Sequence, residues 1–136
     1  MVGIIICTHG EFANGLKNAI EMIVGQQKNF DVICFKNGDD IENLKESLLS
    51  LSKKYRKKNI PCCYIVDLYG ATPFNACVTV SIEEDRPVIT GVNLPILLEL
   101  LMTRENYTDV DFMNYLNNSL QNAKESMQVI NVKSLF

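Results

Sequence analysis

Short runs of mostly apolar residues recur along this chain and end abruptly at polar residues or glycine. Five such runs span residues 4–7, 30–35, 62–66, 87–92 and 129–132. Runs of this length without strict polar alternation are typical of strands that are covered on both faces in a parallel sheet. The pattern predicts five strands, of which the first leads to His9, the third ends at Asp67 and the fifth is short.

Between these runs, apolar residues recur every three or four positions, as they do along one face of a helix. The first such helix is expected to start at His9 and to stop at Gly25. Its inward face would consist of Phe12, Leu16, Ile20 and Ile23. The second helix has the clearest pattern, with its inward face at Ile41, Leu44, Leu48, Leu51 and Tyr55.

Polar residues predict where the later helices begin. Asp39, with Glu42 three residues later, fits a capping box, and Thr72 fits a cap before a proline at the first helical position. Asn93 is expected to cap a fourth helix, and Asp109 to open a fifth. The fifth helix would bury Phe112, Leu116, Leu120 and Ala123.

Strands that alternate with helices of this length predict an α/β fold with a doubly wound, mostly parallel sheet and helices on both faces. We expect the strand order 2-1-3-4, with the fifth strand at an edge, in one domain covering residues 1–136. The winding direction then reverses between the first and third strands. His9 and Asp67 would therefore flank a topological switch point, where open α/β sheets bind ligands.

Charge and composition exclude some classes of function. The chain is 47% hydrophobic and carries a formal net charge of −3, which argues against a nucleic-acid-binding protein. Residues 53–58 are the one basic segment. They are either the last turn of a helix, where positive charge interacts favourably with the helix dipole, or a docking patch for a partner.

The five cysteines, Cys7, Cys34, Cys62, Cys63 and Cys77, contain no C-x-x-C pair and mostly lie inside apolar runs. We expect buried free thiols, as in a reducing compartment. The chain begins without a charged-then-apolar leader and has no apolar run of about 18 residues. The expectation is a cytoplasmic protein without membrane insertion.

His9, the only histidine, and Asp67 form the candidate catalytic pair. A histidine ring can present an unprotonated nitrogen as a nucleophile near neutral pH. A carboxylate that accepts a hydrogen bond from the other ring nitrogen selects the tautomer and orients the ring. The alternatives are a structural histidine and a carboxylate that only caps the next helix.

The sequence around this pair favours an anionic ligand. Gly10 is expected to open the first helix, and Gly70, Ala71 and Thr72 to open the third, so that free amide groups and two helix N-termini converge. The Thr72 hydroxyl could add a donor. These features indicate a phosphoryl group carried on His9, for which the protein supplies mainly positioning and charge stabilisation.

Other chemistries fit the sequence less well. A low-molecular-weight phosphatase with Cys7 as its nucleophile would need an arginine where Ala13 stands. A flavodoxin-type loop would need hydroxyl residues at positions 10–13, but this segment contains an acidic residue, Glu11, and an apolar one, Phe12. Metal binding lacks a second histidine and clustered cysteines, so we expect neither a metal site nor a cofactor.

Three motifs of this chain occur together in a known family. They are Thr8-His9-Gly10 after the first strand, V-D-L-Y-G-A-T-P-F-N-A at residues 66–76, and Gly91-Val92-Asn93-Leu94-Pro95 after the fourth strand. On these motifs the chain resembles, over essentially its whole length, the enzyme IIA components of the mannose class of the bacterial sugar phosphotransferase system. The stretch at residues 66–76 is similar to the V-D-x-x-G-G-S-P-F-N-A stretch of that family.

The resemblance implies a phosphotransferase in which His9 accepts a phosphoryl group from the phosphocarrier protein HPr. His9 would pass it to the cognate enzyme IIB, which serves the membrane subunits IIC and IID. Asp67 matches the aspartate that orients the histidine, and Thr72 matches a hydroxyl position near the phosphate. Ala71 replaces a family glycine, and Leu68 stands where a hydroxyl residue is common. The chain has no segment that resembles enzyme IIB, so we expect it to be similar to the free-standing members, and the sequence does not indicate which sugar is transported.

Two further expectations concern regulation and assembly. A module of the same fold that is phosphorylated without relaying to a transporter remains the alternative function. A fifth strand at residues 128–133 would occupy an edge with unpaired backbone groups, which predicts a homodimer that involves this strand. Members of the family that the chain resembles are dimeric. The alternative is a monomer whose fifth strand closes its own sheet.

Overall fold

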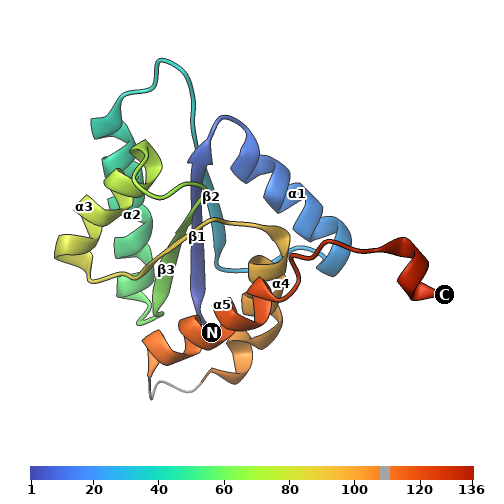
Figure 1. The fold of residues 1–136 in the computed structure, drawn as a ribbon. Coiled ribbons are helices and arrows are strands. Elements are labelled where there is room, and N and C mark those ends of the chain that lie inside the picture. Colours follow the sequence, from blue (N-terminus) through green and yellow to red (C-terminus); the bar gives the residue numbers. More distant parts are fainter. Residues whose placement is uncertain (108–110) are drawn as a thin grey trace.

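The computed structural model describes residues 1–107 and 111–136 and contains one parallel sheet (Figure 1). Within the described residues, the sheet has four strands in the order β2-β1-β3-β4. Their bounds are β1 Gly3–His9, β2 Phe30–Phe35, β3 Cys62–Val66 and β4 Val88–Thr90. The predicted α/β class and the strand order 2-1-3-4 are confirmed.

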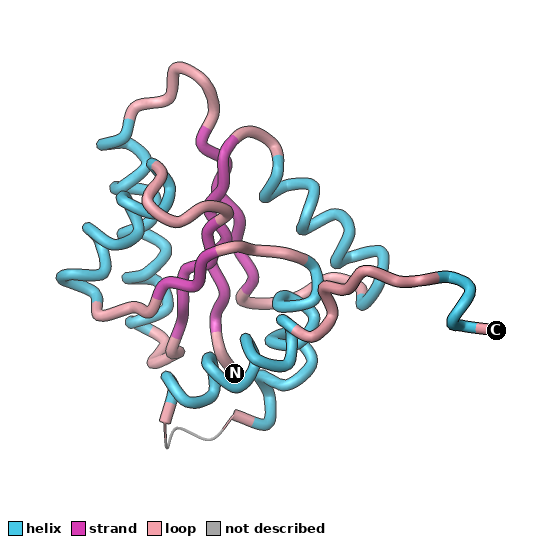
Figure 2. Tube along the Cα trace, in the orientation of Figure 1, coloured by secondary structure: helices cyan, strands magenta, loops and turns pink. Residues whose placement is uncertain are grey.

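The helices form a layer on each face of this sheet (Figures 1 and 2). They are α1 Phe12–Val24, α2 Ile41–Lys57, α3 Thr72–Glu84, α4 Leu94–Thr103 and α5 Phe112–Lys124, with short 3-10 helices η1 Arg104–Asn106 and η2 Val132–Leu135. Helices α1, α4 and α5 pack on the face that carries Ile4 and Ile6. Helices α2 and α3 pack on the face that carries Ile5 and Cys7. Because β1 is buried on both faces, its sequence is continuously apolar.

The predicted fifth strand is wrong. Residues 128–131 form no strand, and Figure 1 shows the C-terminal segment projecting away from the sheet. Val129 and Phe136 are fully exposed. An apolar run becomes a strand only when a neighbouring strand accepts its backbone hydrogen bonds, and the run of residues 129–132 has none in the described chain.

Helix α1 begins three residues later than predicted. β1 continues through His9, which lies opposite Phe35 of β2, and the chain then turns at Gly10 with a φ of 56°. The buried face of α1 consists of Ala13, Leu16 and Ile20, whereas Phe12 and Ile23 are about half exposed. Two of the four expected inward residues therefore point to solvent.

Helix α2 is confirmed, although Ile41 of its predicted inward face is 44% exposed. Its cap is Asp40, whose side chain accepts a hydrogen bond from the Glu42 N–H. The Asp39 side chain instead accepts from the Lys36 N–H. For α3, Ala71 occupies the cap position, so Thr72 is already helical and makes no side-chain cap. Each boundary differs from the prediction by one residue, which is the precision to which helix ends are defined.

The predicted N-caps of α4 and α5 have different outcomes. The Asn93 side chain accepts from the Ile96 N–H, as predicted for α4. Asp109 lies outside the described residues, and α5 is capped by Asp111, which accepts from the Asn114 N–H.

The five cysteines are free thiols, and all except the half-buried Cys34 are fully buried. The expectation of buried free thiols is therefore largely confirmed.

Candidate functional site

The site lies where β1 and β3 end side by side. The two strands are parallel neighbours, with Cys7 opposite Val66, so His9 and Asp67 emerge at the same edge of the sheet. After this edge the chain enters α1 on one face and α3 on the other. The predicted pair therefore occupies a switch point of the winding direction, where parallel sheets open a crevice.

Asp67 holds His9 through both its ring and its backbone. Asp67 Oδ2 lies 2.8 Å from His9 Nδ1 and accepts a hydrogen bond of 3.1 Å from the His9 backbone N–H. The Asp67 side chain is only 15% exposed, whereas the His9 side chain is 49% exposed. The ring is thus fixed at one nitrogen and accessible from solvent.

The remaining polar atoms of the pair are unshared within the described chain. Asp67 Oδ1 is buried without a hydrogen-bond partner there, and His9 Nε2 has none either. Because no other donor competes for the carboxylate in this part of the chain, a positive charge on the His9 ring would be its main electrostatic partner. The arrangement leaves Nε2 free to react while Nδ1 is held.

Gly70, Ala71 and Thr72 lie at the N-terminus of α3, on the loop that Asp67 opens. Gly70 has a φ of 80°, a conformation that favours glycine, and its carbonyl accepts from the Asn75 side chain. The Ala71 N–H makes only a long hydrogen bond of 3.5 Å, to the Leu68 carbonyl. The first turn of α3 therefore retains amide donors, as helix N-termini do.

The Gly10 amide is already used. It donates a 2.8 Å hydrogen bond to the Phe35 carbonyl and extends the pairing of β1 with β2. This amide is therefore not one of the free donors expected around His9. Gly10 instead provides the backbone turn, with nothing within 4 Å of a Cβ placed there.

Sequence comparison places these residues in a known family. The family model EIIA-man, described as "PTS system fructose IIA component", matches residues 3–129. The fructose-specific EIIA component of Bacillus subtilis (strain 168) is 37% identical over 123 residues, which cover 85% of this chain and 80% of that protein. The chain belongs to the EIIA-man family.

Other EIIA-man relatives agree in sequence and fold. The mannose-specific EIIAB component of Escherichia coli (strain K12) is 32% identical over 134 residues, which are 97% of this chain but 40% of that longer protein. The crystal structure of an EIIA component from Streptococcus agalactiae is 25% identical with a TM-score of 0.83, covering 95% of this chain and 97% of that one. This EIIA-man protein is accordingly a component of the sugar phosphotransferase system.

Thr8 belongs to the Thr8-His9-Gly10 motif, but the sequence assigned it no role of its own in the site. It is fully buried, and its Oγ1 accepts a 2.7 Å hydrogen bond from the Ala13 N–H and donates to the His9 carbonyl. Thr8 thus joins the first turn of α1 to the end of β1. A hydroxyl residue that closes an apolar run directly before the histidine was the available signal.

The loop after β2 was also missed. Residues 36–38 of this loop and Phe35 at the end of β2 line a hollow together with His9, Gly10 and Glu11. Lys36 Nζ lies 2.6 Å from Glu11 Oε1, and this contact lowers the pKa of Glu11 and raises that of Lys36. Because β2 neighbours β1, the carboxyl end of β2 had to lie beside His9, which the predicted strand order already implied.

The described part of this EIIA-man chain contains no helix that is long and apolar enough to cross a membrane.

Proposed function

We propose that His9 is the phosphoryl carrier of this EIIA-man protein. The observation that carries the proposal is the 2.8 Å contact between His9 Nδ1 and Asp67 Oδ2, beside a solvent-accessible ring. A proton held on Nδ1 by the carboxylate leaves a lone pair on Nε2. Nε2 is then the nitrogen that attacks phosphorus.

The transfer requires little covalent chemistry from the protein. The bond from Nε2 to phosphorus forms as the bond from phosphorus to the donor atom breaks, and the same steps in reverse deliver the group to the acceptor. Asp67 stabilises the positive ring, and the N-terminus of α3 with Gly70, Ala71 and Thr72 supplies donors for the phosphoryl oxygens. Gly10 contributes the turn that presents His9.

The donor in this proposal is phospho-HPr and the acceptor is the cognate enzyme IIB, which serves membrane subunits IIC and IID. Membership of the phosphotransferase system supports these partners. The reaction is expected in the cytoplasm. The relatives include fructose- and mannose-specific components, so the family leaves the sugar open.

We also propose that the protein works as a homodimer. The C-terminal segment exposes Val129, Ile130, Val132 and Leu135, which a partner could cover. The predicted role of residues 128–133 in assembly remains a proposal, although these residues form no strand of their own sheet.

Intact mass measurement tests the phosphoryl carrier. The protein is incubated with HPr, the kinase of HPr and phosphoenolpyruvate, and we expect one phosphoryl group, lost in acid and kept in alkali, as for a phosphoramidate. The His9→Ala variant should gain none, and full incorporation in that variant refutes the assignment. Addition of enzyme IIB should then remove the group, whereas a group that stays on the protein favours the regulatory module.

A further inference from the structure

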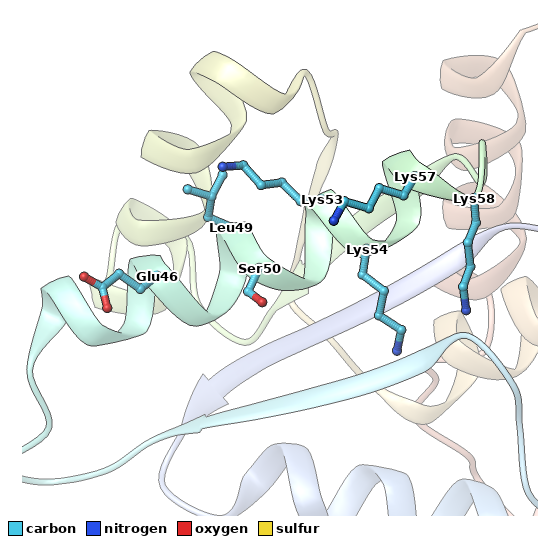
Figure 3. A pocket seen from close by; sticks show the side chains of 7 residues that line it. All are labelled: Glu46, Leu49, Ser50, Lys53, Lys54, Lys57 and Lys58. Atoms are coloured by element: carbon cyan, nitrogen blue, oxygen red, sulfur yellow. The ribbon is translucent and has the colours of Figure 1, made fainter.

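The exposed side of the C-terminal half of α2 and the C-cap residue that follows it carry four lysines, Lys53, Lys54, Lys57 and Lys58, which we call the lysine face. Figure 3 shows their side chains fanning out from the end of the helix. Together with Glu46, Leu49 and Ser50 they line a shallow hollow on the surface. The lysine face concentrates positive charge in a chain whose formal net charge is −3.

Within the described residues, the lysine face has one weak internal contact, in which Lys54 Nζ lies 5.8 Å from the centroid of the Tyr55 ring. None of its amino groups forms an ion pair with a described carboxylate, whereas the adjacent Arg56 lies 2.8 Å from Glu84 Oε2. The C-terminal end of a helix dipole amounts to about half a negative charge. That partial charge is far smaller than the four positive charges, so helix stabilisation alone does not account for them.

The composition of the lysine face discriminates between kinds of partner. Protein interfaces centre on aromatic and arginine anchors and are depleted in lysine. Here Tyr55 is fully buried and Arg56 is held by Glu84, so no such anchor is free. Flexible lysines without an anchor instead fit the diffuse negative potential of a bilayer that contains anionic lipids.

We propose that the lysine face adsorbs this protein to an anionic membrane surface. The contact is peripheral and electrostatic, because lysines dominate the face and its apolar member Leu49 is half-buried. α2 starts near the His9 edge of the sheet, beside the end of β2, and Lys57 ends the helix roughly 24 Å further along its axis. Adsorption at that end leaves the His9 edge accessible.

The inference does not depend on phosphorylation of His9, so it can fail or succeed separately from the proposed function. Each lysine near an anionic surface contributes about fivefold to binding. The Lys53→Gln/Lys57→Gln variant should therefore bind about 30-fold more weakly. The matched control is Lys28→Gln/Lys124→Gln, which removes the same charge from exposed lysines elsewhere.

Vesicle cosedimentation measures the binding, using phosphatidylcholine vesicles with and without phosphatidylglycerol. We expect the wild type to bind only the vesicles with phosphatidylglycerol at low salt, and to be released in about 1 M salt, where the screening length falls to about 3 Å. The control should bind like the wild type. Circular dichroism on both variants verifies that they are folded.

Three results would overturn the proposal. They are equal losses in the variant and its control, equal binding to vesicles without phosphatidylglycerol, and absence of wild-type binding at low salt. Binding to an immobilised polyglutamate peptide without any binding to vesicles would assign the lysine face to an acidic protein instead, and would also overturn the membrane assignment.

Discussion

Asp67 makes two contacts to His9 with a single atom. Its Oδ2 binds the ring nitrogen Nδ1 and the backbone N–H of the same residue, while its side chain is largely buried. Burial in a low-dielectric environment strengthens the interaction between the carboxylate and a positively charged ring. The charge of Asp67, and not only its shape, should therefore matter for transfer.

Substitution Asp67→Asn tests this point because it keeps the shape and removes the charge. We expect phosphoryl transfer to and from His9 to slow by about 10-fold to 10⁴-fold, the range found when carboxylate partners of functional histidines are changed. Thermal unfolding should show that the fold is intact. Rapid-quench measurement of transfer gives the rates, and wild-type values in both directions would contradict the role.

The sequence predicted the central pair of the site but not the residues that support it. His9 and Asp67 follow directly from two apolar runs that end at polar residues. The role of Thr8 was missed because its hydroxyl accepts from the Ala13 N–H across a turn, five residues away, rather than from the usual cap position. The Gly10 amide was expected to be free because the register of β1 with β2, which uses that amide, is not encoded in either strand alone.

At the scale of elements, prediction succeeded where the signal was local. The buried strands β1 and β3 and the helix α2 were recognised because apolar periodicity reports their own burial. The run at residues 129–132 has the same apolar character, yet it forms no strand. Its state depends on a neighbour that periodicity does not specify.

Arg104 links several elements and was not singled out by the sequence. Arg104 is 2% exposed, and its guanidinium donates to the carbonyls of Val2, Lys28 and Asn29 and to the Gln27 side chain. Burial lowers its pKa, which is offset in part by nearby groups. Arg104 thus fixes the starts of β1 and β2 to the end of α4.

Substitution Arg104→Leu should lower the free energy of unfolding by about 3 kcal/mol, because buried carbonyls lose their donors. Urea unfolding followed by circular dichroism measures the change. The exposed Lys124→Leu substitution is the control and should change stability by less than about 0.5 kcal/mol. Equal effects of the two substitutions would show that the Arg104 hydrogen bonds do not support the sheet.

At the scale of the whole molecule, the C-terminal segment is the part that its own fold leaves uncovered. Val129 and Phe136 are fully exposed, and Met127 is 88% exposed. Exposed apolar side chains that lie this close together along the chain are stabilised when a second surface removes them from water. An exchanged or docked segment in a symmetric pair would provide that surface.

A chain that ends at Met127 tests the role of this segment in assembly. We expect light scattering at micromolar concentration to give a dimer for the intact chain and a monomer for the shortened one, because the shortened chain lacks the apolar run. A chain that ends at Val132 keeps the run and serves as the control. A monomeric intact chain would reject the dimer, and a dimeric shortened chain would reject the role of the segment.

The hydrogen bond from the His9 backbone N–H to Asp67 has a consequence for a variant that lacks the His9 ring. The N–H belongs to the main chain, so this bond survives truncation of the His9 side chain, and the carboxylate keeps its place. What remains is the Asp67 Oδ2 acceptor beside the place that the ring occupied. We expect added imidazole to bind this acceptor in a His9→Ala variant, so that the proposed nucleophile could be supplied from solution instead of by the chain.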